Sequence, residues 1–216
     1  YLSIAHCPKQ LEYLTHKFNF FEKEGLTTPK GIFSVISNKK YLQYRFYTKT
    51  LPFFNTYHHL FYPTGKKIVT RNILNMLNPL GLAIWFMDDG SRNIVYYTRK
   101  TDGLTSIRTR KLEWATDSFT LDEHYIIQDY FKVVWGIDVN IHKSKNSHKL
   151  AINSTNAKIF IEIIKPHIVK SMEYKIDLQY NVTVPFGDMI YSDLNSDIQS
   201  SAEMTEPLEE VQERLE

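Results

Sequence analysis

The sequence predicts a mixed α+β fold built from two related halves. Apolar residues recur at three- and four-residue steps in some stretches, as in helices, and alternate with polar residues in others, as in strands. The 13 Phe and 14 Tyr residues, against only 8 Gly and 8 Pro, favour half-buried sheet positions over irregular structure. A hydrophobic content of 43% is enough for a buried core.

The first half is predicted over residues 1–70. Gly25 ends its first helix, and Pro63 follows its last. In order along the chain we expect a strand at 1–5, a helix at 9–23, strands at 31–36 and 41–47 joined as a hairpin, and a helix at 51–61.

The second half is predicted over residues 80–191, after a linker at 71–79. Thr120 and Glu123 have the spacing of a capping box, and Gly136 follows the helix that this box begins. We expect a helix at 80–87, strands at 93–98 and 111–116, a helix from 121 to 135, strands at 137–142 and 149–153, and a helix at 156–164. From the capping box onward this order repeats that of the first half. The first half therefore lacks an opening helix and a first strand.

The charge is distributed unevenly. Residues 192–216 hold eight acidic residues against Arg214 alone, a net −7, which leaves +9 on residues 1–191. A basic body suits a polyanionic partner, while the acidic tail is a candidate arm for docking a protein. The single cysteine, Cys7, excludes an internal disulfide. No apolar run approaches the roughly 18 residues of a membrane span, so we expect no membrane partner.

Residues 80–90 stand out in the second half. Eight consecutive residues without a polar side chain are followed by Asp88, Asp89 and Gly90. A helix that is apolar all round is expected to be buried on every side. Its two terminal carboxylates face the negative end of the helix dipole, and a divalent cation is a candidate to offset their charge.

Residues 82–90 resemble a LAGLIDADG motif, of the kind found as the second copy in monomeric, double-motif homing endonucleases. Further matches at 65–69, 153–155, 164–168 and 172–175 extend the resemblance over residues 1–180. It implies two pseudo-symmetric αββαββα units with saddle-shaped antiparallel sheets along the DNA major groove. Each unit contributes one motif helix to a central seam, and the first unit here lacks its N-terminal helix and strand.

The resemblance implies a site-specific double-strand DNA endonuclease that uses Mg²⁺ or another divalent cation. Asp89 falls on the metal-binding acid. Lys67, or its neighbour Lys66, and Lys175 resemble the basic residues that polarise the phosphate or position the water. Side chains of the strands and their tips are expected to contact double-stranded DNA, and the candidates are Lys39, Lys40, Arg45, Arg92, Tyr97, Arg99, Lys100, Arg108, Arg110, Lys111, Lys143 and Lys145.

A single motif acid cannot build the paired metal site by itself. Three explanations are open: a first motif supplied from before Tyr1 or from another segment, a homodimer through the helix at 80–87, or loss of cleavage. The last leads to an RNA-binding intron maturase, or a ribonucleoprotein component, that holds structured intron RNA by shape and phosphate contacts. Abundant Phe, Tyr, Ile, Asn and Lys suit an AT-rich organellar (mitochondrial or plastid) or phage genome.

Overall fold

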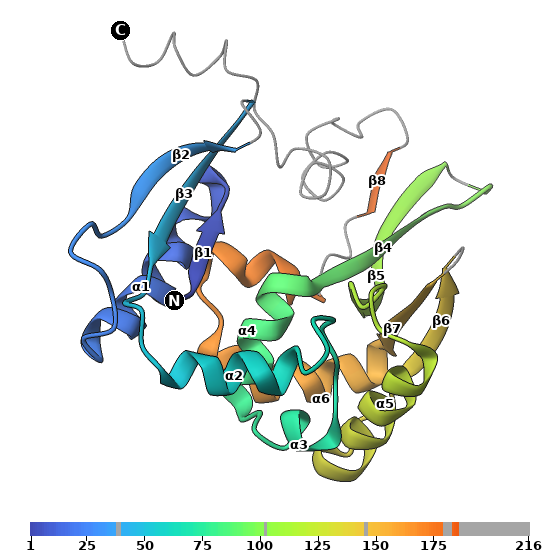
Figure 1. The fold of residues 1–216 in the computed structure, drawn as a ribbon. Coiled ribbons are helices and arrows are strands. Elements are labelled where there is room, and N and C mark those ends of the chain that lie inside the picture. Colours follow the sequence, from blue (N-terminus) through green and yellow to red (C-terminus); the bar gives the residue numbers. More distant parts are fainter. Residues whose placement is uncertain (38–39, 102, 145–146, 179–182, 186–216) are drawn as a thin grey trace, which may run out of the picture. The chain divides into compact units, whose positions relative to one another are not determined.

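The computed structural model describes residues 1–37, 40–101, 103–144, 147–178 and 183–185. It forms two compact units, Tyr1–Asn55 and Thr56–Phe186 (Figure 1). The division falls inside helix α2 (Phe53–Phe61), earlier in the chain than the boundary expected at residue 70. Each unit combines antiparallel strands with helices, which confirms the predicted α+β class.

The first unit is a three-stranded antiparallel sheet covered by one helix. Its elements are β1 (Ser3–His6), the 3-10 helix η1 (Pro8–Gln10), α1 (Leu11–Lys23), β2 (Phe33–Ser37) and β3 (Tyr41–Tyr47), with strand order β1-β3-β2. Phe46 is fully buried, with its ring 5.4 Å from that of Phe18 and 6.0 Å from that of Phe21, both on α1. Successive side chains of a strand point to opposite faces, so Arg45 lies on the face away from α1.

The second unit contains the motif helix and a larger sheet. Its elements are α3 (Arg71–Leu74), α4 (Pro79–Asp89), β4 (Gly90–Thr98), β5 (Leu104–Trp114), α5 (Leu121–Trp135), β6 (Asn140–Ser144), β7 (Ser147–Asn153), α6 (Ser154–Ile164), the 3-10 helices η2 (Lys165–His167) and η3 (Lys170–Lys175), and β8 (Thr183–Pro185). The strands are ordered β4-β5-β7-β6, and β8 pairs with β5.

Trp114 of β5 is the centre of the core of the second unit. Its ring centroid lies 5.2 Å from that of Phe86 on α4, 5.8 Å from that of Phe131 on α5 and 5.1 Å from that of Phe160 on α6. All four side chains are at most 1% exposed. Three helices thus meet one strand residue, and truncation of such a residue costs about 3–5 kcal/mol.

The ends of α5 confirm the predicted signals. The Thr120 hydroxyl accepts a hydrogen bond from the Glu123 amide, and the Glu123 carboxylate accepts one from the Thr120 amide at 2.7 Å. Gly136 ends the helix with φ of 67°, a left-handed conformation that glycine adopts without strain.

Several predicted boundaries differ from the structure, two of them by a whole segment. The expected linker at 71–79 contains α3, whose first turn is capped by the Thr70 hydroxyl. The strand expected at 111–116 begins at Leu104, after a turn in which Gly103 has φ of 68°. Residues 105–110 are polar or basic except for one, so the hydrophobic pattern did not extend over them.

The motif helix is fully buried on one side and half-buried on the other. Leu82, Ala83, Phe86 and Met87 are at most 1% exposed, whereas Trp85 is half-buried. The expectation of burial on every side is therefore corrected. The helix is also longer than predicted, because Pro79 occupies its first position and the Asn78 side chain caps it by accepting from the Gly81 amide at 2.8 Å.

Three predicted features lie outside the described residues: the middle of the turn at 37–40, residue Lys145, and the acidic tail 192–216. Among the helices that are described, none combines the length and the apolar character needed to cross a bilayer.

Candidate functional site

The C-terminal end of α4 presents two carboxylates on a fixed backbone. Asp88 and Asp89 are both exposed. The last carbonyls of a helix lack partners within it, and here other groups bind them. The Gly90 amide bonds to Phe86 O, the Lys175 ammonium donates to Met87 O at 2.6 Å, and the Ala115 amide donates to Asp89 O at 2.9 Å.

Gly90 allows the strand to leave the helix abruptly. Gly90 lies four residues after Phe86, one turn further along the helix. A Cβ on Gly90 would collide with the ring and the carbonyl oxygen of Phe86. The residue directly follows Asp89 and is the first of β4. Glycine at this position thus fixes how the chain turns immediately after the motif carboxylate.

Lys175 brings a positive charge to the same helix end. It is only 9% exposed and is the last residue of η3, where Met172 is fully buried. Cations stabilise helix C-termini, where the dipole is negative. The sequence suggested a divalent cation to offset Asp88 and Asp89, and the structure supplies a buried ammonium at this end.

Lys66 and Lys67 lie beside the start of α5. Both are exposed, and the Lys67 ammonium is 5.8 Å from the ring centroid of Phe119. Just after them, the Val69 amide donates to the Glu123 carboxylate at 2.8 Å. The lysine pair predicted for the first half therefore belongs, in the structure, to the second unit.

Glu123 is held as a carboxylate. Partial burial pushes the pKa of Glu123 up, but hydrogen bonds from the Thr120 amide, the Val69 amide and the Thr120 hydroxyl, with the charge of Lys66, outweigh it. The pKa of Glu123 is therefore below its ordinary value of 4.5.

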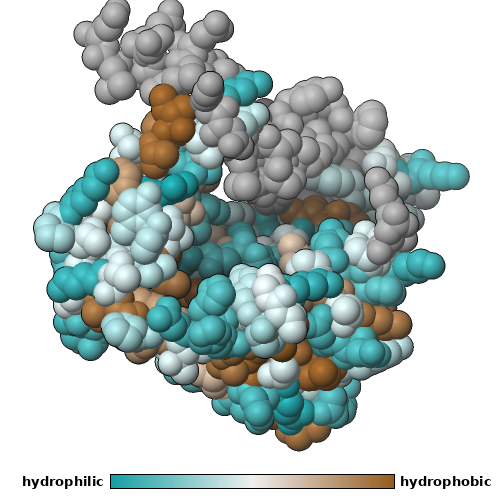
Figure 2. Space-filling model, viewed as in Figure 1, coloured by the Kyte–Doolittle hydropathy of each residue, from teal (hydrophilic) through white to brown (hydrophobic). Residues whose placement is uncertain are grey.

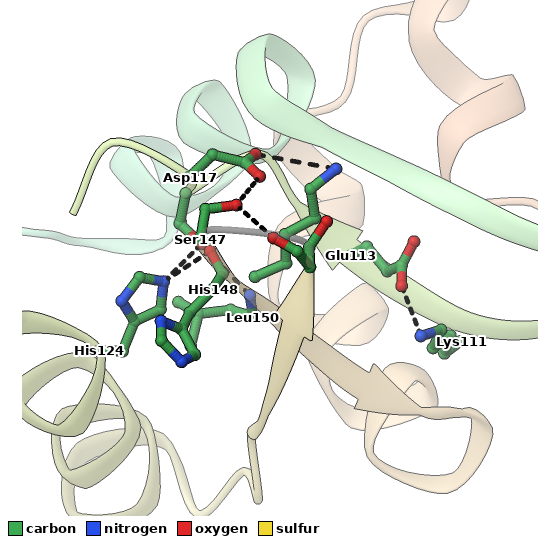
Figure 3. A network of polar contacts seen from close by, with 10 residues as sticks. Lys111, Glu113, Asp117, His124, Ser147, His148 and Leu150 are labelled. Carbon is green, nitrogen blue, oxygen red and sulfur yellow. Dashed lines mark hydrogen bonds and ion pairs between the residues drawn. The ribbon is translucent and has the colours of Figure 1, made fainter. Parts of the chain in front are cut away.

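The segment from Ala115 to Thr120 connects these groups. At one end, the Ala115 amide donates to Asp89 O. Near the other end, the ring of Phe119 faces the Lys67 ammonium. Figure 3 shows how it is anchored: Asp117 accepts from the Ser147 hydroxyl at 2.8 Å. The Asp117 carboxylate also lies 3.7 Å from the Lys149 ammonium. This anchoring was not predicted, because its partners come from β7, about 30 residues further along the chain.

A buried histidine also fixes the position of the Ala115–Thr120 segment. His124, labelled in Figure 3, is fully buried. Its Nδ1 lies 2.7 Å from Thr120 O, and its Nε2 lies 3.0 Å from the Thr116 hydroxyl. The Thr116 hydroxyl also accepts from the Leu150 amide at 3.2 Å. Buried polar groups need such partners, so this network gives the Ala115–Thr120 segment a defined position.

Apart from Arg92, the predicted nucleic-acid contacts fall into three groups. Exposed side chains are found at Lys40, Tyr97, Arg99, Lys100, Arg110 and Lys143. The tip of the β4–β5 hairpin, at the right edge of Figure 2, is correspondingly hydrophilic. Arg45 and Lys111 are half-buried, and Lys111 pairs with Glu113 at 2.5 Å. Arg108 pairs with Val95 in the β4–β5 register, and Lys39 and Lys145 lie outside the described residues.

Arg92 is placed differently from the other candidates. Its side chain is 5% exposed, and its guanidinium donates to Asp177 O at 2.7 Å and lies 3.9 Å from the Asp177 carboxylate. The Thr109 hydroxyl bonds to the same carbonyl at 3.4 Å. Arg92 thus holds the chain that follows η3 against the β4–β5 hairpin, and it is not a surface side chain.

The oxygen chemistry at the helix end fits a partly built magnesium site. No group of three or more His, Cys, Asp or Glu side chains that could hold a metal ion occurs within the described part of the chain. Magnesium is commonly bound through one or two carboxylates, with water and substrate phosphates as the other ligands. Exposed Asp88 and Asp89 are of that type.

The fold and this helix end define a protein of the LAGLIDADG class. Residues 1–160 match the LAGLIDADG DNA endonuclease family, and the chain belongs to this family. This membership confirms the resemblance inferred from residues 82–90.

Two curated relatives illustrate the family. The cytochrome b mRNA maturase bI2 of Debaryomyces hansenii is 33% identical over 134 residues, which cover 61% of this chain and 45% of that protein. The probable intron-encoded DNA endonuclease 3 of Mycosarcoma maydis is 30% identical over 138 residues, which cover 62% of this chain and 92% of that protein. The chain spans less than half the length of the first of these relatives.

A solved homing endonuclease has the same fold. I-WcaI bound to its DNA recognition sequence is similar with a TM-score of 0.65 at 20% sequence identity, covering 82% of this chain and 75% of that one. The meganuclease I-SmaMI, bound to uncleaveable DNA, gives a TM-score of 0.50 at 13% identity, covering 80% and 75%.

Proposed function

We propose that this chain binds a specific duplex DNA sequence and hydrolyses its phosphodiesters at the C-terminal end of α4. The carrying observation is the exposed Asp89 carboxylate, fixed at its backbone by the Ala115 amide, in a member of a DNA endonuclease family. A nuclease needs such a group to be fixed in place and yet accessible to the phosphate.

Asp89 is the proposed metal ligand. A bound Mg²⁺ would supply positive charge for the phosphate and a water of lowered pKa. Asp89 is one of the two motif acids that the family resemblance implies, and the exposed Asp88 is its neighbour. The coordination left open by Asp89 is assigned to phosphate, water and a second motif acid.

Lys175 has two proposed contributions. Its buried ammonium holds the Met87 carbonyl and so fixes the helix turn that carries Asp89. The resemblance implies contact with the phosphate as well, and such contact requires the ammonium to share or leave its bond to Met87. We therefore assign Lys175 first to positioning the carboxylate-bearing turn, and second to stabilising negative charge.

Lys67 is the proposed phosphate contact, with Lys66 as its alternate. Both are exposed, and the Lys67 ammonium lies 5.8 Å from the ring centroid of Phe119. Phe119 belongs to the segment whose other end, Ala115, bonds to the Asp89 backbone. An exposed lysine is free to act as a mobile point charge on a phosphate. The carboxylate of Glu123, in the first turn of α5, accepts from three donors: the Val69 amide, the Thr120 amide and the Thr120 hydroxyl.

The strands are the proposed DNA-reading surface. Lysines mostly grip phosphates, whereas arginine reads guanine with two hydrogen bonds. Exposed Arg99 and Lys100 at the β4–β5 tip and Arg110 on β5 are the strongest candidates. The acidic tail 192–216 is retained as a proposed protein-docking arm, and an organellar or phage genome as the proposed source.

An RNA-binding maturase is the second candidate function. It is favoured by the 33% identity to a protein named as a cytochrome b mRNA maturase. The same basic strand surface would then hold a folded intron through shape and phosphate contacts.

The two candidates are separated by selection from random pools. Pools of duplex DNA and of structured RNA are passed over the full chain in Ca²⁺, and the bound duplexes are transferred to Mg²⁺ and scored for double-strand ends. Recovery of a duplex consensus that is cut only in Mg²⁺ supports the endonuclease. Recovery of an RNA consensus, with no duplex consensus and no cut ends, supports the maturase and contradicts the first proposal.

A further inference from the structure

The side chain of Glu123 connects two parts of the second unit that are distant in sequence. Its Oε2 accepts from the Thr120 amide at 2.7 Å and from the Thr120 hydroxyl at 2.9 Å. Its Oε1 accepts from the Val69 amide at 2.8 Å, 54 residues earlier in the chain. One carboxylate oxygen therefore closes the α5 capping box, and the other holds the segment after α2.

The bond to Val69 is not needed for capping. A capping box requires a single acceptor oxygen on its third helical residue, and glutamine also serves in that position. Val69 is only 8% exposed, so its N–H has little access to water. Without the Glu123 acceptor that buried donor would have to find another partner or bear a desolvation cost.

The held segment carries the lysine pair. Gly65 turns the chain with φ of 78°, the Ile68 amide donates to Phe61 O at 2.9 Å, and the Val69 amide donates to Glu123. Exposed Lys66 and Lys67 lie between Gly65 and these two consecutive anchored amides. Their backbone is therefore fixed at one end to α2 and, through Glu123, to the start of α5.

The segment that ends at Thr120 is in turn anchored beside Asp89. Ala115 bonds to Asp89 O, and Phe119 lies under the Lys67 ammonium. The Asp89 backbone, the segment 115–120, the Glu123 side chain and the lysine segment are thus joined in series by hydrogen bonds and the covalent chain.

We propose that Glu123 is a positioning residue that sets the Lys66–Lys67 pair relative to Asp89. The effect on cleavage rests on the proposed endonuclease function. The tether, which is the hydrogen bond from the Val69 amide to Glu123, does not depend on that function. A displaced lysine keeps its charge but loses its alignment with the reacting phosphate, and misplacement on the scale of an ångström is enough to slow a reaction.

Amide hydrogen exchange tests the tether without requiring activity. In Glu123→Ala we expect the Val69 amide to exchange about tenfold faster, because one hydrogen bond to a charged acceptor is lost. Thr120→Ala is the matched control, since it removes the cap hydroxyl and leaves the Val69 bond. The Leu150 amide on β7 reports global opening in both variants. An unchanged Val69 amide in Glu123→Ala, or equal acceleration in both variants, overturns the proposal.

Cleavage tests the catalytic consequence on the duplex selected above. We expect the single-turnover rate of Glu123→Ala to fall about tenfold with duplex affinity within about twofold, while Thr120→Ala keeps the wild-type rate. In a Lys67→Met background, Glu123→Ala should add no further loss, because the two residues act as one unit. Additive losses contradict positioning through Lys67. Absence of cleavage by the wild-type chain refutes the endonuclease function instead, and the exchange result then decides the tether alone.

Discussion

The ammonium of Lys175 donates to the carbonyl oxygen of Met87 at 2.6 Å, two residues before Asp89. Two carboxylates at the negative end of a helix are unfavourable, and this bond places a buried positive charge at that end. Lys175 thus stabilises the helix turn that carries Asp88 and Asp89. Its ammonium already offsets part of the negative charge at this helix end before any metal cation binds.

We expect Lys175→Met to destabilise the fold by about 1–3 kcal/mol, because Met87 O is left without its donor. Urea unfolding measures the change. The exposed Lys170, on the same 3-10 helix, provides the control variant Lys170→Met, which should change stability by less than about 0.5 kcal/mol. Equal midpoints for the two variants would contradict the assigned role of Lys175.

Gly90→Ala should cost about 1–3 kcal/mol, because the added methyl group collides with the ring and carbonyl of Phe86. Gly81→Ala is the matched substitution within α4: its new methyl group would lie 3.1 Å from Leu77 Cδ2, the flexible end of a side chain. Alanine also favours a helix interior over glycine by up to about 1 kcal/mol. Thermal unfolding should therefore rank Gly90→Ala well below Gly81→Ala, and the reverse order would contradict the described close contact.

Glu123 gives the stability a specific dependence on pH. Its pKa in the folded protein is below the ordinary value of 4.5, so the stabilisation that it provides is complete above pH 4.5 and is lost as the pH falls through the folded-state pKa. In Glu123→Gln this part of the acid dependence should disappear. Urea unfolding of both proteins from pH 7 down to pH 3 measures the difference, and parallel stability curves would count against a lowered pKa.

Arg110 and Arg92 should respond differently to removal. Arg110 is exposed, so Arg110→Ala should weaken duplex binding and lower the slope of log K against log salt by about 1. Arg92 is bonded to Asp177, so Arg92→Ala should instead destabilise the fold by about 1–3 kcal/mol and leave the salt slope unchanged. Titrations at several salt concentrations separate the two outcomes, and a lowered slope for Arg92→Ala would show that its guanidinium reaches DNA.

Local sequence signals predicted much of the fold. The capping box at Thr120 and Glu123, the glycine at 136 and the apolar run before Asp88 each identify an element from neighbouring residues, and the structure confirms these elements. The early part of β5 was missed because it is polar, and α3 was missed because it is only one turn long.

The polar contacts of the site could not be predicted in the same way. Lys175 meets Met87 across 88 residues, and Glu123 meets Val69 across 54. In the sequence, Lys175 and Lys67 are indicated by the family resemblance, and Glu123 is indicated only as a helix cap. The tertiary fold decides which partners these groups meet. Such long-range contacts leave no periodic pattern of apolar residues in the sequence from which they could be predicted.

The most direct test of the endonuclease proposal compares Asp89→Asn with Asp88→Asn in Mg²⁺-dependent cleavage of the selected duplex. Both residues are exposed at the same helix end, so the two variants lose the same charge. We predict that Asp89→Asn abolishes cleavage while it still binds the duplex in Ca²⁺, and that Asp88→Asn retains most of the cleavage rate. Unchanged cleavage by Asp89→Asn would contradict the assignment of this carboxylate to the metal.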